Sequence, residues 1–241
     1  SKGEYIFLTP DHELNLPPAP ALNRENNPYR GLESFDKSHK DLFFGRDQDV
    51  QDLLERLSDP CPLLVILGAS GTGKSSLVKA GLLPRLEQHQ DYYHVLPVMR
   101  PGADPLQALA VSCATLAPDE TIEQLTQRFT HNKATFAELI DKWWQKQADS
   151  PSPKTLLLVI DQAEELITQA SEHEARQLHA LVIAAIASYP KYFRVITTLR
   201  LDFEAQFQTT EAYRDIWMEA RIVFLQMIQA HIRDAIEQPA S

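Results

Sequence analysis

The chain has 241 residues, a hydrophobic fraction of 44%, a charged fraction of 23% and a formal net charge of −10, values typical of a globular protein with one or two domains. Its longest apolar runs have about six residues, which excludes a membrane span, and its acidic balance argues against nucleic acid as a partner. Two cysteines, Cys61 and Cys113, are too few for a disulfide framework, so we expect a reducing, cytoplasmic location.

The first predicted segment, residues 1–26, has the composition of a connector. Residues 3–8 predict a short strand, and the proline-rich stretch 16–20 predicts an extended, stiff chain. We interpret the segment as a linker or as the end of an upstream domain, with an ordinary flexible terminus as the alternative. A globular domain is expected over residues 27–226.

Within this domain, strands and helices are predicted to alternate. Apolar residues recur at helical spacing in some segments and as short continuous runs in others. The predicted helices cover residues 47–57, 104–116, 121–130, 134–147 and 171–188, and the predicted strands cover residues 62–67, 92–99, 155–160, 193–199 and 221–225. A further helix is predicted after the first strand, to about residue 86, with Pro84 breaking it. The alternation indicates an α/β fold with a mainly parallel five-stranded sheet and helices on both faces.

A glycine-rich turn follows the first of these strands within the domain. Residues 68–75 read Gly-Ala-Ser-Gly-Thr-Gly-Lys-Ser, the G-x-x-x-x-G-K-[ST] phosphate loop. Consecutive backbone N–H groups in such a turn surround a polyphosphate, and the following helix adds the positive end of its dipole. Lys74 can reach the outer phosphates, and the Ser75 hydroxyl can ligate a Mg²⁺ ion that bridges them. We therefore predict a nucleoside triphosphate site on a P-loop NTPase three-layer sandwich, since a merely flexible turn does not explain the lysine and the hydroxyl.

Carboxylates follow the strand predicted at residues 155–160. An aspartate at the end of an apolar strand, Asp161, is not expected to be buried unpaired, and beside the phosphate loop it would bind the Mg²⁺ ion through a water. Gln162 holds the place where many P-loop ATPases carry a catalytic glutamate, and it cannot act as a base. We therefore expect that either Glu164 or Glu165 polarises the attacking water, or that hydrolysis is slow. The alternative is that both glutamates only open the next helix, where the dipole favours them.

Arg200 directly follows the strand predicted at residues 193–199. In sheets of this type, that strand lies between the phosphate-loop strand and the aspartate strand, so that its end points at the terminal phosphate. We predict that Arg200 senses this phosphate, because a fixed guanidinium matches phosphate oxygens well. A surface salt bridge to Asp202 is the alternative.

Five segments of the chain, in order, resemble those of one protein family. They are residues 27–32, 43–46, 71–84, 161–166 and 198–203. From about residue 27 onward, the chain resembles the STAND class of signal-transduction P-loop ATPases, related to the NACHT and apoptotic ATPases. More narrowly, it is similar to bacterial STAND ATPases that often carry WD-repeats. It departs from their pattern at Ala163, where the family commonly has a bulkier apolar residue.

The resemblance implies a molecular switch with an ADP-bound resting form and an ATP-bound form that oligomerises and activates an attached effector. The effector would lie upstream, where residues 2–7 faintly resemble the end of a caspase-like protease domain, and WD-repeat sensors would lie downstream. Residues 227–241 would then begin a helical domain that is truncated here. The alternatives are an AAA-like ATPase acting on nucleic acid and a non-hydrolysing scaffold that keeps its nucleotide for stability.

The resemblance also places Gly45 and Arg46 near the adenine of ATP or ADP, with Tyr29 beside them. Adenine rests on the resemblance, because the phosphate loop does not specify a base. The full set of predicted nucleotide-binding residues is Tyr29, Gly45, Arg46, Gly68, Ser70, Gly71, Thr72, Gly73, Lys74, Ser75 and Ser76.

Overall fold

The structure of the chain is a computed structural model. It describes residues 35–36, 43, 45–58, 60–89, 91–147, 153–208 and 213–225. All of them belong to the unit Leu32–Ser241. The predicted linker, Tyr29 and the predicted start of a helical domain lie outside the described residues.

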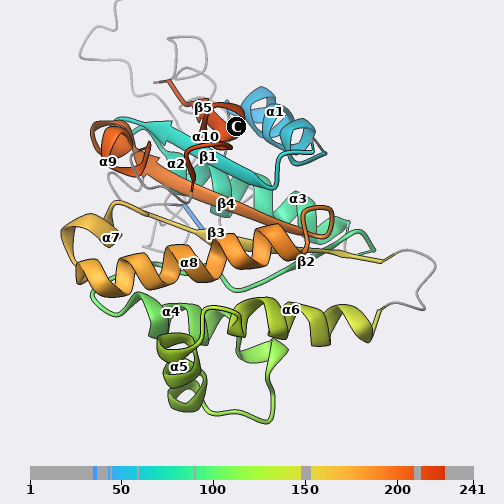
Figure 1. Ribbon diagram of the computed structural model, residues 1–241. Coiled ribbons are helices and arrows are strands. Elements are labelled where there is room, and N and C mark those ends of the chain that lie inside the picture. The colour runs from blue at the N-terminus through green and yellow to red at the C-terminus, as the bar shows by residue number, and fades with distance from the viewer. Residues whose placement is uncertain are drawn as a thin grey trace, which may run out of the picture. The chain divides into compact units, whose positions relative to one another are not determined.

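The described strands form one parallel sheet in the order β2-β3-β4-β1-β5 (Figure 1). Their bounds are β1 Leu63–Gly68, β2 Tyr93–Val95, β3 Thr155–Ile160, β4 Phe193–Arg200 and β5 Arg221–Val223. β4 lies between the phosphate-loop strand β1 and the aspartate strand β3, as predicted. Because all strands run the same way, the segments that follow β3 and β4 lie at the same end of the sheet, on the left of Figure 1.

Helices occupy most of the remaining described chain. Their bounds are α1 Asp47–Ser58, α2 Lys74–Ser76, α3 Leu83–Gln88, α4 Pro105–Ser112, α5 Ile122–His131, α6 Thr135–Gln145, α7 Glu165–Thr168, α8 Glu172–Ser188, α9 Glu204–Gln208 and α10 Trp217–Ala220, with further helical segments η2 Leu77–Leu82, η3 Ala114–Leu116 and η4 Leu201–Phe203. Local chemistry sets some of these bounds. For example, Thr121 and Gln124 bond each other's backbone N–H groups at the start of α5, which satisfies two amides that have no partner within the helix. None of the helices in this part of the chain combines the length and apolar character needed to cross a bilayer.

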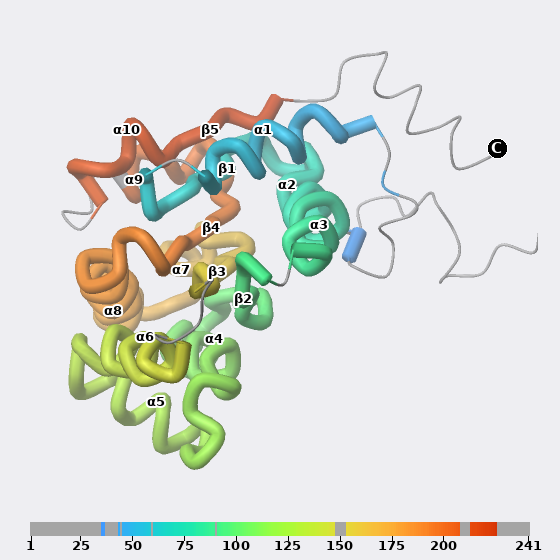
Figure 2. The backbone as a smooth tube through the Cα atoms, turned by 90° about the vertical axis from the view of Figure 1, so that its right-hand side faces the viewer, coloured from blue at the N-terminus to red at the C-terminus, as the bar shows by residue number. Residues whose placement is uncertain are grey.

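Alternate side chains of β1 enter two separate hydrophobic cores. Leu64 and Ile66 pack with α1, η2 and α3, whereas Leu63, Val65 and Leu67 pack with α4, α5, α6 and α8. Figure 2 shows α8 and α3 on opposite sides of the strands. Side chains of a strand alternate between its two faces, so an apolar strand such as β1 must be covered on both. The P-loop NTPase three-layer sandwich predicted from the sequence is confirmed.

The helical run after the phosphate loop differs from the prediction at Pro84. The segments α2, η2 and α3 follow one another without a gap. Within η2 the turn is of the wider π type, in which the N–H of Leu83 donates to the carbonyl of Val78, five residues back. This turn places Pro84 in the first turn of α3, where a missing N–H is tolerated. The prediction that Pro84 breaks the helix was therefore wrong.

Candidate functional site

The phosphate loop between β1 and α2 depends on three glycines for two different reasons. Gly71 and Gly73 have φ angles of 76° and 88°, in the left-handed region that other residues rarely adopt. Gly68 instead has a close neighbour, because a Cβ at this position would lie 2.7 Å from the carbonyl oxygen of Phe224. These glycines allow the backbone to curl tightly at the end of β1.

The side chain of Lys74 lies within this curl. Its Nζ donates hydrogen bonds to the carbonyl oxygens of Gly68, at 2.9 Å, and Ala69, at 2.8 Å, and the residue is only 8% exposed. Burial lowers the pKa of Lys74, while the nearby Glu164 carboxylate opposes this effect. A phosphate is a charged acceptor and forms stronger bonds than these neutral carbonyls, so the ammonium is poised to transfer its bonds to a polyphosphate.

The two residues predicted to bind a metal lie in contact. The hydroxyl of Ser75 donates a 2.7 Å hydrogen bond to Oδ1 of Asp161, and the hydroxyl of Thr198 on β4 donates another of 2.7 Å to the same oxygen. Asp161 is 1% exposed. Burial raises the pKa of Asp161, but the Lys79 ammonium and the two hydroxyls outweigh burial and hold that pKa below its usual value. The carboxylate is therefore charged and fixed in place.

This donor set fits a magnesium ion. Hydroxyl and carboxylate oxygens are the hard donors that Mg²⁺ prefers, and the ion usually takes few protein ligands besides substrate phosphates and water. Ser75 can donate its proton to Asp161 and still offer its oxygen lone pairs to a metal. A bound ion would bridge the outer phosphates and neutralise their charge.

Two contacts of Asp161 were not anticipated from the sequence. Lys79 places its Nζ 2.6 Å from Oδ2 of Asp161, and Thr198 reaches Oδ1 from β4. The spacing held a signal for Lys79, since it lies four positions after Ser75 and therefore on the same side of a helix. For Thr198 the signal was the strand order, because pairing of Ile160 with Thr197 puts the next residue of each strand side by side.

The two candidate catalytic glutamates have different surroundings. Glu164 is half-buried, and its Oε2 accepts a 3.3 Å hydrogen bond from the backbone N–H of Arg200. Glu165 is 5% exposed. Its carboxylate accepts hydrogen bonds from the Arg100 guanidinium at 2.5 Å and from the backbone N–H of Gly102 at 2.9 Å. The environment of Glu164 adjoins the phosphate loop, whereas both oxygens of Glu165 are engaged by a neighbouring segment. Neither catalytic role is tested by this geometry.

Gln162, directly after Asp161, has an unusual backbone conformation. Its φ angle of 59° lies in the left-handed region, which costs energy for a residue with a side chain. Its N–H donates a 2.8 Å hydrogen bond to the hydroxyl of Thr198, and its side-chain oxygen accepts one from Arg100. These bonds hold the strained turn that directs the chain from β3 into α7.

Arg200 ends β4 opposite Gly68 of the phosphate loop. Its Nε and Nη2 donate hydrogen bonds of 3.1 Å and 2.6 Å to Asp202, and its guanidinium lies 5.2 Å from the ring centre of Phe203. The structure therefore contains the salt bridge that the sequence offered as the alternative role. The pairing of Arg200 with Gly68 also places the residue near the loop, where its charge adds to burial in lowering the pKa of Lys74. The phosphate-sensing role stays a prediction.

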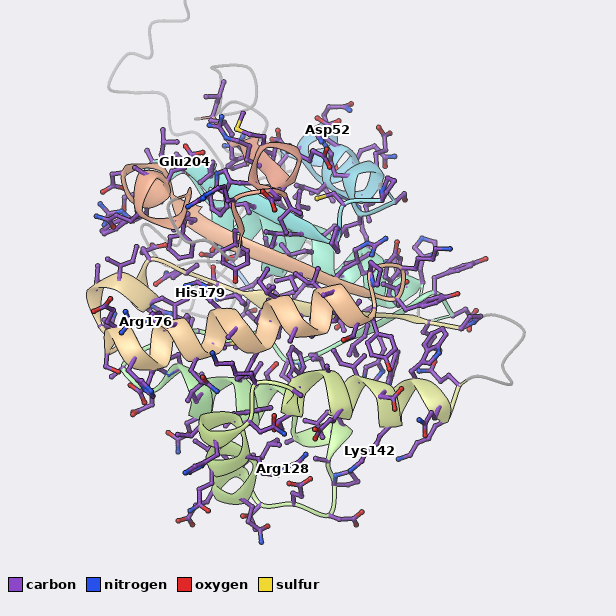
Figure 3. All side chains as sticks on the ribbon, in the orientation of Figure 1. Asp52, Arg128, Lys142, Arg176, His179 and Glu204 are labelled. Atoms are coloured by element: carbon purple, nitrogen blue, oxygen red, sulfur yellow. The ribbon has the colours of Figure 1, made fainter. Side chains whose placement is uncertain are left out.

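A cavity of about 250 Å³ has walls from α1, β1, η2 and β5. Asp52 lies at its α1 wall (Figure 3). Arg46 lines it too, with its guanidinium 4.1 Å from the ring centre of Phe224 and its Nη2 donating to the carbonyl of Thr72 over 3.4 Å. Arg46 thus connects the cavity to the phosphate loop, and Gly45 precedes it with a φ angle of 78°. The walls combine the charged side chains of Arg46, Asp49 and Asp52 with apolar side chains of β1, η2 and β5, and such a mixture of apolar surface and a few polar groups suits a planar base.

The remaining predicted nucleotide-binding residues differ in accessibility. Ser70 is exposed at the outer turn of the loop and Thr72 is buried. Ser76 is also buried, and its hydroxyl accepts a 3.0 Å hydrogen bond from the N–H of Phe35. Tyr29 lies outside the described residues, so its predicted place beside a base is not tested.

Solved structures that share this fold include the following two. The Walker-type ATPase of Pyrococcus abyssi is similar with a TM-score of 0.54 at 13% identity, over 86% of this chain and 61% of that chain. The ORC2 protein of Aeropyrum pernix, solved as ADPNP–ADP complexes, is similar with a TM-score of 0.52 at 14% identity, over 81% of this chain and 51% of that chain. This chain therefore spans about half to three fifths of the length of those proteins. At these identities the likeness shows the fold alone.

A search of curated proteins finds no match. The comparison with protein families does find one, because residues 28–241 match the family described as Novel STAND NTPase 1. The matched region includes the phosphate loop, Asp161 and Arg200, which were among the residues that carried the resemblance. That resemblance is confirmed, and the chain is an NTPase module: it belongs to the novel STAND NTPase 1 family.

Proposed function

We propose that this chain is a nucleotide-operated switch that binds ADP and ATP together with Mg²⁺ and hydrolyses ATP slowly. The observation that carries the proposal is the convergence of Lys74, Ser75 and Asp161 at the end of the parallel sheet. The ammonium lies within the loop, and the hydroxyl lies 2.7 Å from the carboxylate. Together they supply a cation for the outer phosphates and oxygen donors for a bridging metal.

Slow hydrolysis follows from the groups available to polarise water. Gln162, which follows Asp161, cannot accept a proton, and the carboxylate of Glu165 already accepts two hydrogen bonds. Glu164 is the remaining candidate base, and one of its oxygens accepts a hydrogen bond from the backbone of Arg200. A site without a dedicated, free base suits a switch, whose output lies in the difference between its bound states.

An adenine base is proposed for the cavity beside Arg46. The family resemblance of the sequence supports adenine, and the apolar part of the cavity wall, with Ile222 and Phe224, supports a planar ring. Thr72 of the phosphate loop accepts a hydrogen bond from Arg46, so one nucleotide could span both places.

The regulatory part of the proposal extends to partners. The ATP-bound form would oligomerise and activate an effector fused upstream, such as a caspase-like protease, and WD-repeats downstream would sense the trigger. Support for this part comes from the family resemblance of the sequence.

The test starts from the purified protein quenched in acid, with the released nucleotide identified by mass spectrometry. The proposal expects ADP, hydrolysis well below one turnover per second in single-turnover assays, and larger particles by light scattering with a non-hydrolysable ATP analogue than with ADP. A guanine nucleotide would overturn the adenine assignment. Stimulation of hydrolysis by DNA or RNA would favour the AAA-like alternative. Unchanged turnover and assembly in both Glu164→Gln and Glu165→Gln would favour the scaffold.

A further inference from the structure

We propose that Lys79 is a built-in counter-ion of Asp161, which allows the site to hold ADP without a metal ion. This inference rests on the proposed function, since it concerns the same nucleotide site. It assigns to Lys79 a role that the phosphate-loop pattern does not contain, because that pattern ends at Ser75.

The geometry around Asp161 separates two sides of its carboxylate. On one side, Oδ1 accepts hydrogen bonds from Ser75 and Thr198, each of 2.7 Å. On the other side, Oδ2 lies 2.6 Å from the ammonium of Lys79. Lys79 therefore neutralises the carboxylate from the side away from Ser75, the metal ligand. A magnesium ion and the Lys79 ammonium can be present together.

Charge balance explains the consequence for nucleotide binding. A buried carboxylate repels an incoming diphosphate, and at protein dielectric values a like charge several ångströms away changes affinity by more than about tenfold. A metal ion ordinarily removes this repulsion. Here the carboxylate of Asp161 is 1% exposed and already paired with a cation, so the repulsion is offset before any metal binds. Lys74 remains available for the phosphates.

Lys79 is held in this role by the helix that carries it. It lies four positions after Ser75 in a continuous helical run, so both side chains project toward Asp161. Its side chain is 22% exposed, which leaves the pair only weakly screened by water and salt. The ammonium of Lys74 instead bonds to carbonyls of the phosphate loop. The two lysines therefore have separate tasks.

The test measures the affinity of the full chain for ADP by calorimetry, once with Mg²⁺ and once with EDTA. We expect the two affinities of the wild-type chain to differ by less than about fivefold. Lys79→Gln keeps a polar side chain but carries no charge, so the ratio of ADP affinities with and without Mg²⁺ should grow at least about tenfold relative to wild type. Lys79→Arg should behave as wild type, because it keeps the charge. Lys142→Gln, which removes an exposed lysine of α6 (Figure 3), is the matched control for loss of one positive charge.

Two results would overturn the inference. One is a wild-type difference larger than fivefold, which needs no variant and so holds even if Lys79→Gln fails to fold. The other concerns folded Lys79→Gln: its ratio of ADP affinities with Mg²⁺ and with EDTA exceeds the wild-type ratio by less than tenfold. If the wild-type chain binds no ADP even with Mg²⁺, the proposed function itself fails. This outcome differs from the two results above, in which the wild-type chain does bind ADP.

Discussion

Ser75 and Asp161 lie 86 positions apart in the chain, yet the hydroxyl of Ser75 donates a 2.7 Å hydrogen bond to the carboxylate of Asp161. The strands that precede them in the chain, β1 and β3, are not neighbours, because β4 lies between them. Thr198 of β4 donates to the same oxygen, so the intervening strand completes the contact. The order of strands, more than any single segment, therefore assembles the site.

Lys74→Ala is expected to weaken binding of ATP and ADP by at least about a hundredfold. The substitution removes a buried cation whose charge-assisted bonds to phosphate are each worth about 1.5–3 kcal/mol. Calorimetry with Mg²⁺ measures the effect, and Lys142→Ala on the exposed face of α6 serves as the control. Unaltered affinity in Lys74→Ala would show that the loop does not bind the phosphates.

Arg200→Ala is expected to leave ADP affinity within about threefold of wild type and to reduce the preference for ATP over ADP by about tenfold, the worth of one charge-assisted bond. Arg200 pairs with Asp202, so a terminal phosphate would have to compete with this carboxylate. The companion variant Asp202→Asn should therefore raise the preference for ATP. The ratio of the two affinities, measured by fluorescence titration, decides the matter, and equal losses for both nucleotides would contradict the sensor role.

The fold could be predicted from the sequence because two of its inner strands, β1 and β3, are almost wholly apolar. A run such as residues 155–160 must be buried on both faces, and that requirement implies helices on both sides of the sheet. The bounds of the edge strand β2 were harder to predict. It was predicted over residues 92–99 and covers only Tyr93–Val95, because Pro97 has no N–H for the ladder. Met99 bonds to β3 again beyond it.

Within the site, the residues that follow a motif could be predicted, and those that depend on tertiary contact could not. Lys74, Ser75 and Asp161 belong to recognisable patterns at the ends of strands. The contact of Thr198 with Asp161 depends on the pairing of β3 with β4. The hydrogen bond from Arg100 to Glu165 depends on a loop from another part of the chain. Single-sequence patterns carry no information on such distant partners.

Glu164→Gln and Glu165→Gln are expected to have opposite consequences. Glu164 adjoins the loop, so its substitution should lower single-turnover hydrolysis by about a hundredfold, the lower end of the range for loss of a general base, with little effect on stability. Glu165 is buried and accepts hydrogen bonds from Arg100 and Gly102, so its substitution should lower the free energy of unfolding by about 1–3 kcal/mol. Urea denaturation and quenched-flow assays of both variants separate the two effects. A large loss of hydrolysis in a stable Glu165→Gln would reverse the assignment.

His179 is expected to make the folded chain sensitive to acid. It lies on α8 (Figure 3) and is packed against Phe207, and its Nδ1 lies 2.9 Å from the hydroxyl of Tyr213. Burial lowers the pKa of His179 to about 4, whereas in an unfolded chain a histidine has a pKa near 6.5. Between these values the unfolded state binds more protons, so the free energy of unfolding falls as the pH is lowered through this window. The full difference between the two pKa values corresponds to a loss of about 3 kcal/mol in the free energy of unfolding.

Urea denaturation at several pH values between 7.5 and 4.5 measures this loss. His179→Gln removes the titrating ring, so the free energy of unfolding of this variant should change less with pH than that of wild type. The matched control is His173→Gln, which removes an exposed histidine from the first turn of the same helix and should keep the wild-type slope. The contribution of Asp161 falls in a different range, because its pKa lies below the usual value of an aspartate and its stabilisation is lost only as the pH falls below that usual value. If wild type and His179→Gln lose stability in parallel down to pH 4.5, His179 is not the source of the acid sensitivity.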